Sequence, residues 1–178
     1  MRLFVAVNFN DETRNRLIRI KDELRKNSEQ GNFTVAENLH LTLAFLGECN
    51  AKQTAAAKAV MDRISFEPFD LEIERVGYFN RNEGDLWWVG VKECEHLTQQ
   101  QQTLADELSL AGFTIEKRKF SPHITIGRKV VTNEKARSIE SFGETISKIE
   151  LMESKRNNGK LTYVSIHERE TISNEFQK

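Results

Sequence analysis

Two stretches of the chain contain a histidine and a threonine that alternate with apolar residues, which is the period of a strand with one buried face. They are residues 39–46, with the sequence LHLTLAFL, and residues 123–127, with the sequence HITIG. Apolar or alternating runs predict further strands over residues 2–8, 69–79, 86–91, 145–153 and 160–167. Apolar residues at helical spacing predict helices over residues 12–28, 51–64, 95–111 and 132–141.

In this prediction the order strand, helix, strand, helix, strand occurs twice. The two central strands begin at His40 and His123, about half of the 178-residue chain apart. We therefore expect one domain over residues 1–178, built from two pseudo-symmetric halves of about residues 1–80 and 81–178. The expected fold is α+β, with two lobes related by a pseudo-twofold axis.

Composition narrows the class of protein. The chain has 26 Lys and Arg against 27 Asp and Glu, a net charge of −1, which excludes a strongly basic nucleic-acid binder and leaves only a local patch for such contacts. Its two cysteines, Cys49 and Cys94, are too few for a disulfide framework and are expected to be reduced thiols. Because no apolar run approaches the roughly 18 residues of a membrane span, we expect a globular cytoplasmic protein with no membrane partner.

Three of the four histidines are followed two residues later by a threonine. In the strands that begin at His40 and His123, residues two apart share one face, so each strand presents an imidazole and a hydroxyl together. His96 lies at a predicted helix start, where residues two apart point in different directions, so its threonine is read as a chance match. His167 is read as a solvated strand end.

Two such strands suit an in-line displacement at phosphorus. Two groups that titrate near neutral pH can act as acid and base, while the hydroxyls of Thr42 and Thr125 hold the non-bridging phosphate oxygens. The residues themselves do not decide which histidine is the acid. Two other readings are a solvent-exposed His-Thr face without a role and a zinc site, which the missing third ligand and metal-binding motifs disfavour.

The chain resembles the two-histidine (2H) phosphoesterase superfamily, in the branch of RNA 2′,3′-cyclic phosphodiesterases, also called 2′–5′ RNA ligases. The resemblance spans nearly the whole chain and includes the segments 2–7 (RLFVAV), 37–48 (ENLHLTLAFLGE), 86–91 (LWWVGV) and 120–128 (FSPHITIGR). It implies two lobes, each an antiparallel sheet with outer helices, and an active cleft between them. It also implies metal-independent opening of terminal RNA 2′,3′-cyclic phosphates to 2′-phosphomonoesters, with no cofactor, by a monomer that acts on RNA 3′ ends or nucleoside 2′,3′-cyclic phosphates.

The resemblance also assigns roles to individual residues. His40 would be the proton donor to the leaving 3′ oxygen and His123 the proton acceptor that activates water, while Thr42 and Thr125 would hold the phosphate. Arg128 stands where the family commonly has arginine, and would contact phosphate or the RNA backbone unless it is only a surface charge.

Phe79 matches a family aromatic residue that could stack on the terminal base, although a strand-end aromatic could equally be core. The chain departs from the family at 83–85, where Glu-Gly-Asp replaces a common Pro-Arg pair, so Asp85 puts an anion in place of a cation. Arg81 or Arg75 could compensate for the missing charge.

Other functions fit the same residues. The histidine pair could act on a 2′–5′ linkage, in hydrolysis or ligation, or on another cyclic nucleotide. A non-catalytic module that binds RNA ends or nucleotides is the alternative outside enzymes. Binding alone does not need two groups that exchange protons near neutral pH, which favours the enzyme.

Overall fold

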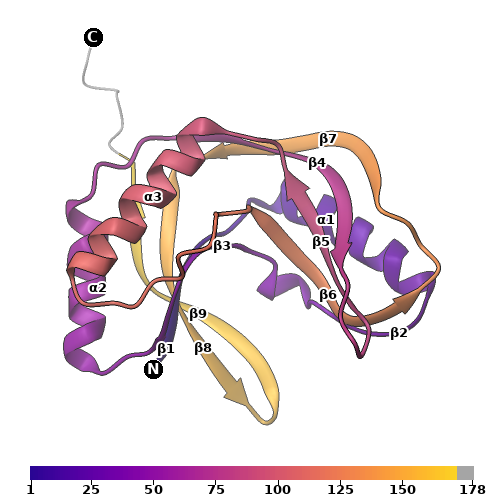
Figure 1. Ribbon diagram of the computed structural model, residues 1–178, viewed down its shortest axis with the longest axis horizontal. Coiled ribbons are helices and arrows are strands. Elements are labelled where there is room, and N and C mark those ends of the chain that lie inside the picture. The colour runs from indigo at the N-terminus through magenta and orange to yellow at the C-terminus, as the bar shows by residue number, and fades with distance from the viewer. Residues whose placement is uncertain (172–178) are drawn as a thin grey trace.

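The computed structural model describes residues 1–171, and these form two antiparallel sheets flanked by three α-helices (Figure 1). One sheet has four strands in the order β3-β1-β8-β9, and the other has five in the order β2-β6-β5-β4-β7. The strands are β1 (Arg2–Val7), β2 (Ser28–Phe33), β3 (Leu41–Glu48), β4 (Phe69–Phe79), β5 (Asp85–Val91), β6 (His123–Thr132), β7 (Arg137–Ile146), β8 (Lys148–Asn157) and β9 (Lys160–Glu170). The helices are α1 (Asp11–Lys26), α2 (Ala51–Arg63) and α3 (Glu95–Leu110), with a 3₁₀ turn η1 (Ala36–Asn38) before β3. The predicted α+β class with two antiparallel sheets is confirmed.

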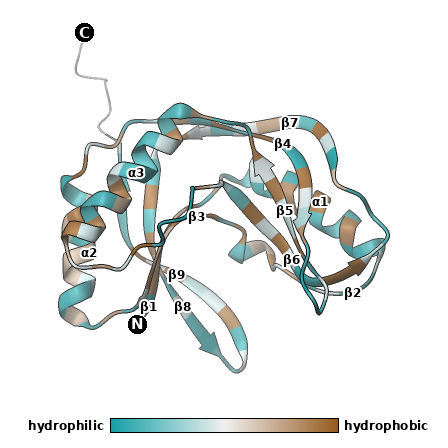
Figure 2. Cartoon of the chain, in the orientation of Figure 1, coloured by the Kyte–Doolittle hydropathy of each residue, from teal (hydrophilic) through white to brown (hydrophobic). Residues whose placement is uncertain are grey.

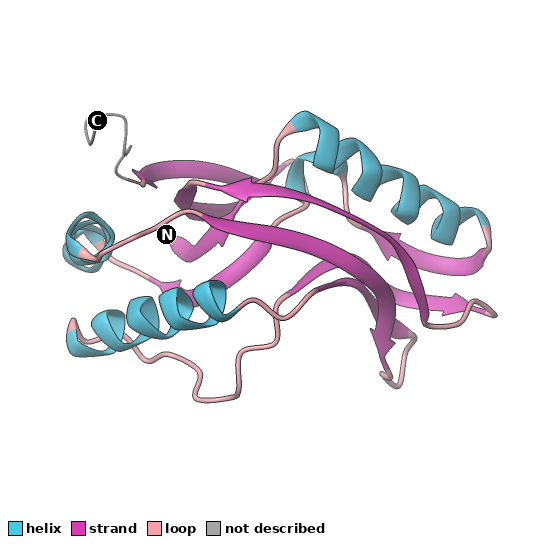
Figure 3. Cartoon of the chain, turned by 90° about the horizontal axis from the view of Figure 1, so that it is seen from above, coloured by secondary structure: helices cyan, strands magenta, loops and turns pink. Residues whose placement is uncertain are grey.

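Each sheet has one outer face covered by helices and one inner face that carries a His-Thr pair. Helix α1 contacts β2, β6 and β7, whereas α3 contacts β3 and α2 contacts β9. Figure 3 shows the helices at the periphery, with the strands between them. Ile124 and Ile126 of β6 and Leu41 of β3 are buried in the core, so the alternating His and Thr residues lie on the opposite, inner faces.

A smaller cluster of apolar residues forms on the inner face of the four-stranded sheet. Phe4 and Ala6 of β1 pack there with Met152 of β8 and the half-buried Tyr163 of β9. Beyond this cluster the β8–β9 hairpin extends away from the helices, and its tip is hydrophilic (Figure 2). The inner face of the four-stranded sheet is therefore aromatic near β3, where Phe4 and Tyr163 form its floor, and polar at the tip of the β8–β9 hairpin.

The two sheets do not correspond to the two halves of the sequence. The four-stranded sheet joins β1 and β3 from the first half to β8 and β9 from the second, and the five-stranded sheet joins β2 and β4 to β5, β6 and β7. Each sheet thus depends on pairings between segments far apart in the chain. None of the helices within residues 1–171 is long and apolar enough to cross a membrane.

The predicted helix over residues 132–141 is wrong. This segment continues β6 and then forms β7, which pairs antiparallel with β4 from Phe69 to Val76. Phe142 and Ile146 of β7 are buried, because pairing with the open edge of β4 outweighs local helical propensity. The strand–helix order of the first half is therefore not repeated in the second.

A second difference is β2, which the sequence analysis places inside or after the first helix. Its sequence, SEQGNF, is short and polar and carries no strand pattern. It forms because it pairs with β6 at the edge of the five-stranded sheet. The predicted strand over residues 123–127 covers the first half of β6, and that over residues 145–153 spans the end of β7 and the start of β8. The remaining predicted elements agree with the structure to within a few residues, and β4 agrees at both ends.

Candidate active site

The structure brings His40 and His123 together from different sheets. His40 immediately precedes β3, which is an edge strand of the four-stranded sheet, and His123 is the first residue of β6. Strands β3 and β6 contact each other. The positive charges of His123 and of Arg128 in β6 both lower the pKa of His40, so these three side chains lie within electrostatic range.

Strands β3 and β6 each contain a β-bulge, at the same position relative to the histidine. In each strand the third residue after the histidine, Leu43 or Ile126, is an extra residue between two consecutive partners on the neighbouring strand. A bulge shifts the alternation by one, so the fifth residue after the histidine, rather than the fourth, returns to the inner face. These fifth residues are Phe45 in β3 and Arg128 in β6, and both are exposed.

The two histidines are held in the same way. Nδ1 of His40 lies 2.7 Å from the carbonyl oxygen of Asn38, and Nδ1 of His123 lies 2.8 Å from that of Ser121. A carbonyl oxygen only accepts hydrogen bonds, so in the neutral ring Nδ1 carries the proton and Nε2 keeps its lone pair. Both rings therefore present Nε2 as the atom that can gain or give a proton.

The surroundings of the two rings differ. Nε2 of His40 lies 2.9 Å from the hydroxyl oxygen of Thr42, and its ring packs 4.9 Å from Phe4 and 5.1 Å, edge to face, from Tyr163. Among residues 1–171, the ring of His123 meets one aromatic neighbour at a comparable distance, Phe79, at 5.8 Å and an interplanar angle of 84°. His40 is thus enclosed by β1 and β9, whereas His123 is supported from one side by β4.

Burial and nearby positive charges together lower the pKa of His40. Burial is the largest cause that lowers its pKa, and the positive charges of Arg128, Arg14 and His123 lower it further. The hydrogen bond to the Asn38 carbonyl opposes them. In the free protein these causes favour neutral His40, which accepts a hydrogen bond from the Thr42 hydroxyl.

Arg128 lies within β6 rather than at the end of a strand, and it is exposed. Together with the β4–β5 hairpin it lines a cavity of about 310 Å³. Phe79 is half-buried, and its ring lies 5.4 Å from Trp88, with the Arg81 guanidinium 5.6 Å above it. A base stacked on Phe79 would have to replace the contact with Arg81.

Phe45 is a further residue of the inner face, which the sequence patterns did not indicate. Its side chain is 64% exposed, and its ring lies 6.3 Å from Phe4 on the floor beside His40. Phe45 and Arg128 stand at the same offset from the two histidines in the sequence, but the pairing register is needed to show that both lie on the inner face.

The remaining histidines lie outside this group. His96 is exposed at the start of α3. The expectation that His167 is a solvated strand end is wrong, since it is half-buried and its Nε2 lies 2.8 Å from the Asp62 carboxylate. Within residues 1–171 no group of three or more His, Cys, Asp or Glu residues could hold a metal ion.

Comparisons with known proteins agree with this geometry. The model of the 2′-5′ RNA ligase superfamily matches residues 9–158. An RNA 2′,3′-cyclic phosphodiesterase of Archaeoglobus fulgidus is 37% identical over 152 residues, which cover 81% of this chain and 85% of that protein. One of Thermotoga maritima is 36% identical over 131 residues, covering 72% of this chain and 70% of that protein.

Among solved structures, Escherichia coli LigT complexed with 3′-AMP has a TM-score of 0.84 at 27% identity, covering 97% of this chain and 98% of that one. The resemblance inferred from the motifs is confirmed: the chain belongs to the 2′-5′ RNA ligase superfamily of two-histidine phosphoesterases.

Proposed function

We propose that the protein hydrolyses the terminal 2′,3′-cyclic phosphate of RNA to a 2′-phosphomonoester without a metal ion or cofactor. The observation that carries this proposal is the matched presentation of two Nε2 atoms by β3 and β6, with an arginine beside them. The names of the related proteins support the same substrate class.

In the proposed reaction His123 is the base and His40 is the acid. Nε2 of His123 takes a proton from water, whose oxygen attacks phosphorus in line with the 3′ oxygen. The bond between phosphorus and the 3′ oxygen breaks, and Nε2 of His40 gives its proton to that oxygen. The phosphate stays on the 2′ oxygen.

Hydroxyl and guanidinium groups stabilise the charge that grows on the non-bridging oxygens. Thr42 and Thr125 lie on the inner face with their histidines, and Arg128 returns to that face through the bulge. Preorganised donors of this kind lower the barrier without reorganising during the reaction.

The lowered pKa of His40 fits its role as acid once substrate is bound. A cyclic phosphate carries a negative charge, which offsets the positive charges of Arg128 and His123 that disfavour protonated His40. Substrate binding therefore raises the pKa of His40 and favours the form that can donate a proton.

The aromatic residues near the histidines have two roles: one holds a catalytic ring in place, and another binds the terminal base. Phe79 already contacts His123 and Arg81, so its role is to hold the ring of the base in place. The exposed ring of Phe45 is available for the terminal base, whose stacking on an aromatic side chain is sequence-tolerant. The protein is proposed to act as a cytoplasmic monomer, and its two unpaired cysteines suit a reducing compartment.

The test is hydrolysis of a short RNA that ends in a 2′,3′-cyclic phosphate, in excess EDTA. Wild type, His123→Ala and the control His96→Ala are compared, and the product is identified by chromatography against 2′- and 3′-phosphate standards. We expect a 2′-phosphate from wild type and control, and almost none from His123→Ala. If wild type binds the RNA without turnover, the protein is a binding module and the proposal is wrong.

A further inference from the structure

We propose a second phosphate subsite, in the cavity between the β4–β5 hairpin and β6, that holds the phosphodiester preceding the terminal nucleotide of RNA. The inference rests on the proposed function, because it adds a subsite to the same substrate. It predicts that the protein prefers oligonucleotide ends to mononucleosides.

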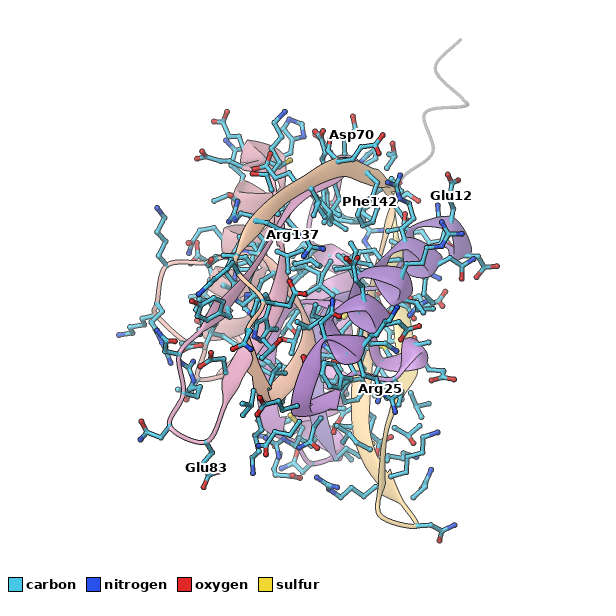
Figure 4. The ribbon with its side chains drawn as sticks, turned by 90° about the vertical axis from the view of Figure 1, so that its right-hand side faces the viewer. Glu12, Arg25, Asp70, Glu83, Arg137 and Phe142 are labelled. Atoms are coloured by element: carbon cyan, nitrogen blue, oxygen red, sulfur yellow. The ribbon has the colours of Figure 1, made fainter. Side chains whose placement is uncertain are left out.

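The cavity has a volume of about 310 Å³ and three cationic residues in its lining, Arg81, Arg128 and Lys129. The lining contains one carboxylate, that of Glu83, whose oxygen lies 3.4 Å from Nζ of Lys129. Three cations against Glu83 give the cavity lining an excess of positive charge, which Asp85 beside it reduces but does not cancel, so the cavity can attract an anion. Figure 4 shows Glu83 at the outer end of the hairpin.

Two consecutive residues of β6 line this cavity because of a second bulge. Arg128 and Lys129 together stand opposite the single residue Leu86 of β5, and Lys129 has a left-handed backbone with a φ of 54°. In a regular strand neighbouring side chains point to opposite faces. The bulge instead directs two adjacent cations to one cavity.

The hairpin is fixed in place against β6. Gly84 has a φ of 114°, and a Cβ at this position would lie 2.6 Å from the carbonyl carbon of Lys129, so only glycine allows this approach. The carboxylate of Asp85 accepts a hydrogen bond of 3.2 Å from the backbone N–H of Arg81. The anion at position 85 thus shapes the turn that presents Arg81, and a preformed site loses less entropy on binding.

Arg128 and the contacts of Arg81 relate the cavity to the reaction site. Arg128 lines the cavity and also lowers the pKa of His40 by its charge. On the other side, Arg81 lies over Phe79, which meets the ring of His123 edge to face. The proposed subsite places the preceding phosphate of an RNA end near Arg81 when its cyclic phosphate lies at the two histidines.

The experiment compares three substrates by kcat/KM: a mononucleoside 2′,3′-cyclic phosphate, the same molecule with a 5′-phosphate, and a dinucleotide that ends in a cyclic phosphate. Wild type is measured beside Arg81→Gln, which removes a cation of the cavity. Arg25→Gln is the matched control, because Arg25 is exposed on α1, which covers the outer face (Figure 4).

We expect wild type and Arg25→Gln to prefer the dinucleotide over the mononucleoside by about tenfold, the range of one charge-assisted contact. Arg81→Gln should remove most of this preference and reduce the salt dependence for the dinucleotide by a slope of about 0.7, one phosphate contact to a single strand. A gain from the 5′-phosphate alone shows that phosphate is recognised, whereas a gain that appears only with the added nucleoside overturns the phosphate assignment.

Glu83→Gln should change the preference for the dinucleotide in the direction opposite to Arg81→Gln. It frees Lys129 from its ion pair, so the preference for the dinucleotide should rise by about threefold, as for an exposed ion pair. Equal hydrolysis of all three substrates by wild type and Arg81→Gln would overturn the subsite and leave the proposed function intact. Hydrolysis of none of them by wild type would overturn the proposed function itself.

Discussion

Strands β3 and β6 are built alike, yet they surround their histidines differently. Both hold Nδ1 on a carbonyl oxygen two residues earlier, and both carry a bulge at the third residue after the histidine. His40, however, lies among Phe4 and Tyr163, whereas His123 has Phe79 on one side. The backbone therefore sets a symmetric geometry, and side chains from neighbouring strands make one ring different from the other.

The largest effect should come from removing either ring. His40→Ala and His123→Ala should each lower the rate on an RNA cyclic phosphate by about 10²–10⁴-fold, the usual contribution of one acid or base. Single-turnover rates measure this, with His96→Ala as a matched control on exposed α3. A loss under tenfold in both variants would contradict the symmetric roles of the two strands.

Removing the hydroxyls should have the next largest effect. Thr42→Val and Thr125→Val keep the shape of the side chain and remove a donor to the phosphate, so each should lower kcat by about 10–100-fold, below the loss of a strong oxyanion donor. The control Thr98→Val lies in α3, where its hydroxyl bonds the Cys94 carbonyl. If only one of the two site variants loses activity, the phosphate is not shared between the strands.

Opening the enclosure around His40 should change the pH profile more than the rate. Tyr163→Leu exposes the ring and weakens the burial that lowers the pKa of His40. Because the acid must be protonated, the alkaline fall of kcat/KM should move to higher pH. Phe79→Leu, the matched change beside His123, should leave that limb in place, and an equal shift in both variants would remove the proposed asymmetry.

The smallest effect concerns stability. The pKa of His40 is lower in the folded state than the 6.5 of an unperturbed histidine, so between the two values the unfolded chain binds a proton that the folded chain does not. This contribution to the free energy of unfolding is present above pH 6.5 and is lost as pH falls through that window. His40→Gln should therefore lose less stability than wild type between about pH 7.5 and 5.5 in urea titrations, since the Gln side chain does not titrate there. His96→Gln should behave like wild type, and a parallel loss in all three proteins would contradict the assignment.

Local sequence patterns predict some strands of the fold but not the strands that depend on distant partners. The alternation of His and Thr with apolar residues places β3 and β6 and shows that His40 and Thr42 share a face with each other, as do His123 and Thr125. It does not predict β2 or β7, because both strands depend on partners distant in the chain. Nor does a period of two reveal an extra residue, so the bulges that turn Phe45 and Arg128 inward are visible only in the pairing register.

The central claim is that His40 and His123 act as an acid and a base, and the pH dependence of kcat/KM tests it most directly. Wild type should give a bell-shaped profile on an RNA 2′,3′-cyclic phosphate. The residual activity of His40→Ala should lose the alkaline limb, and that of His123→Ala should lose the acidic limb. A profile that keeps both limbs in either variant, or loses the same limb in both, would contradict the account.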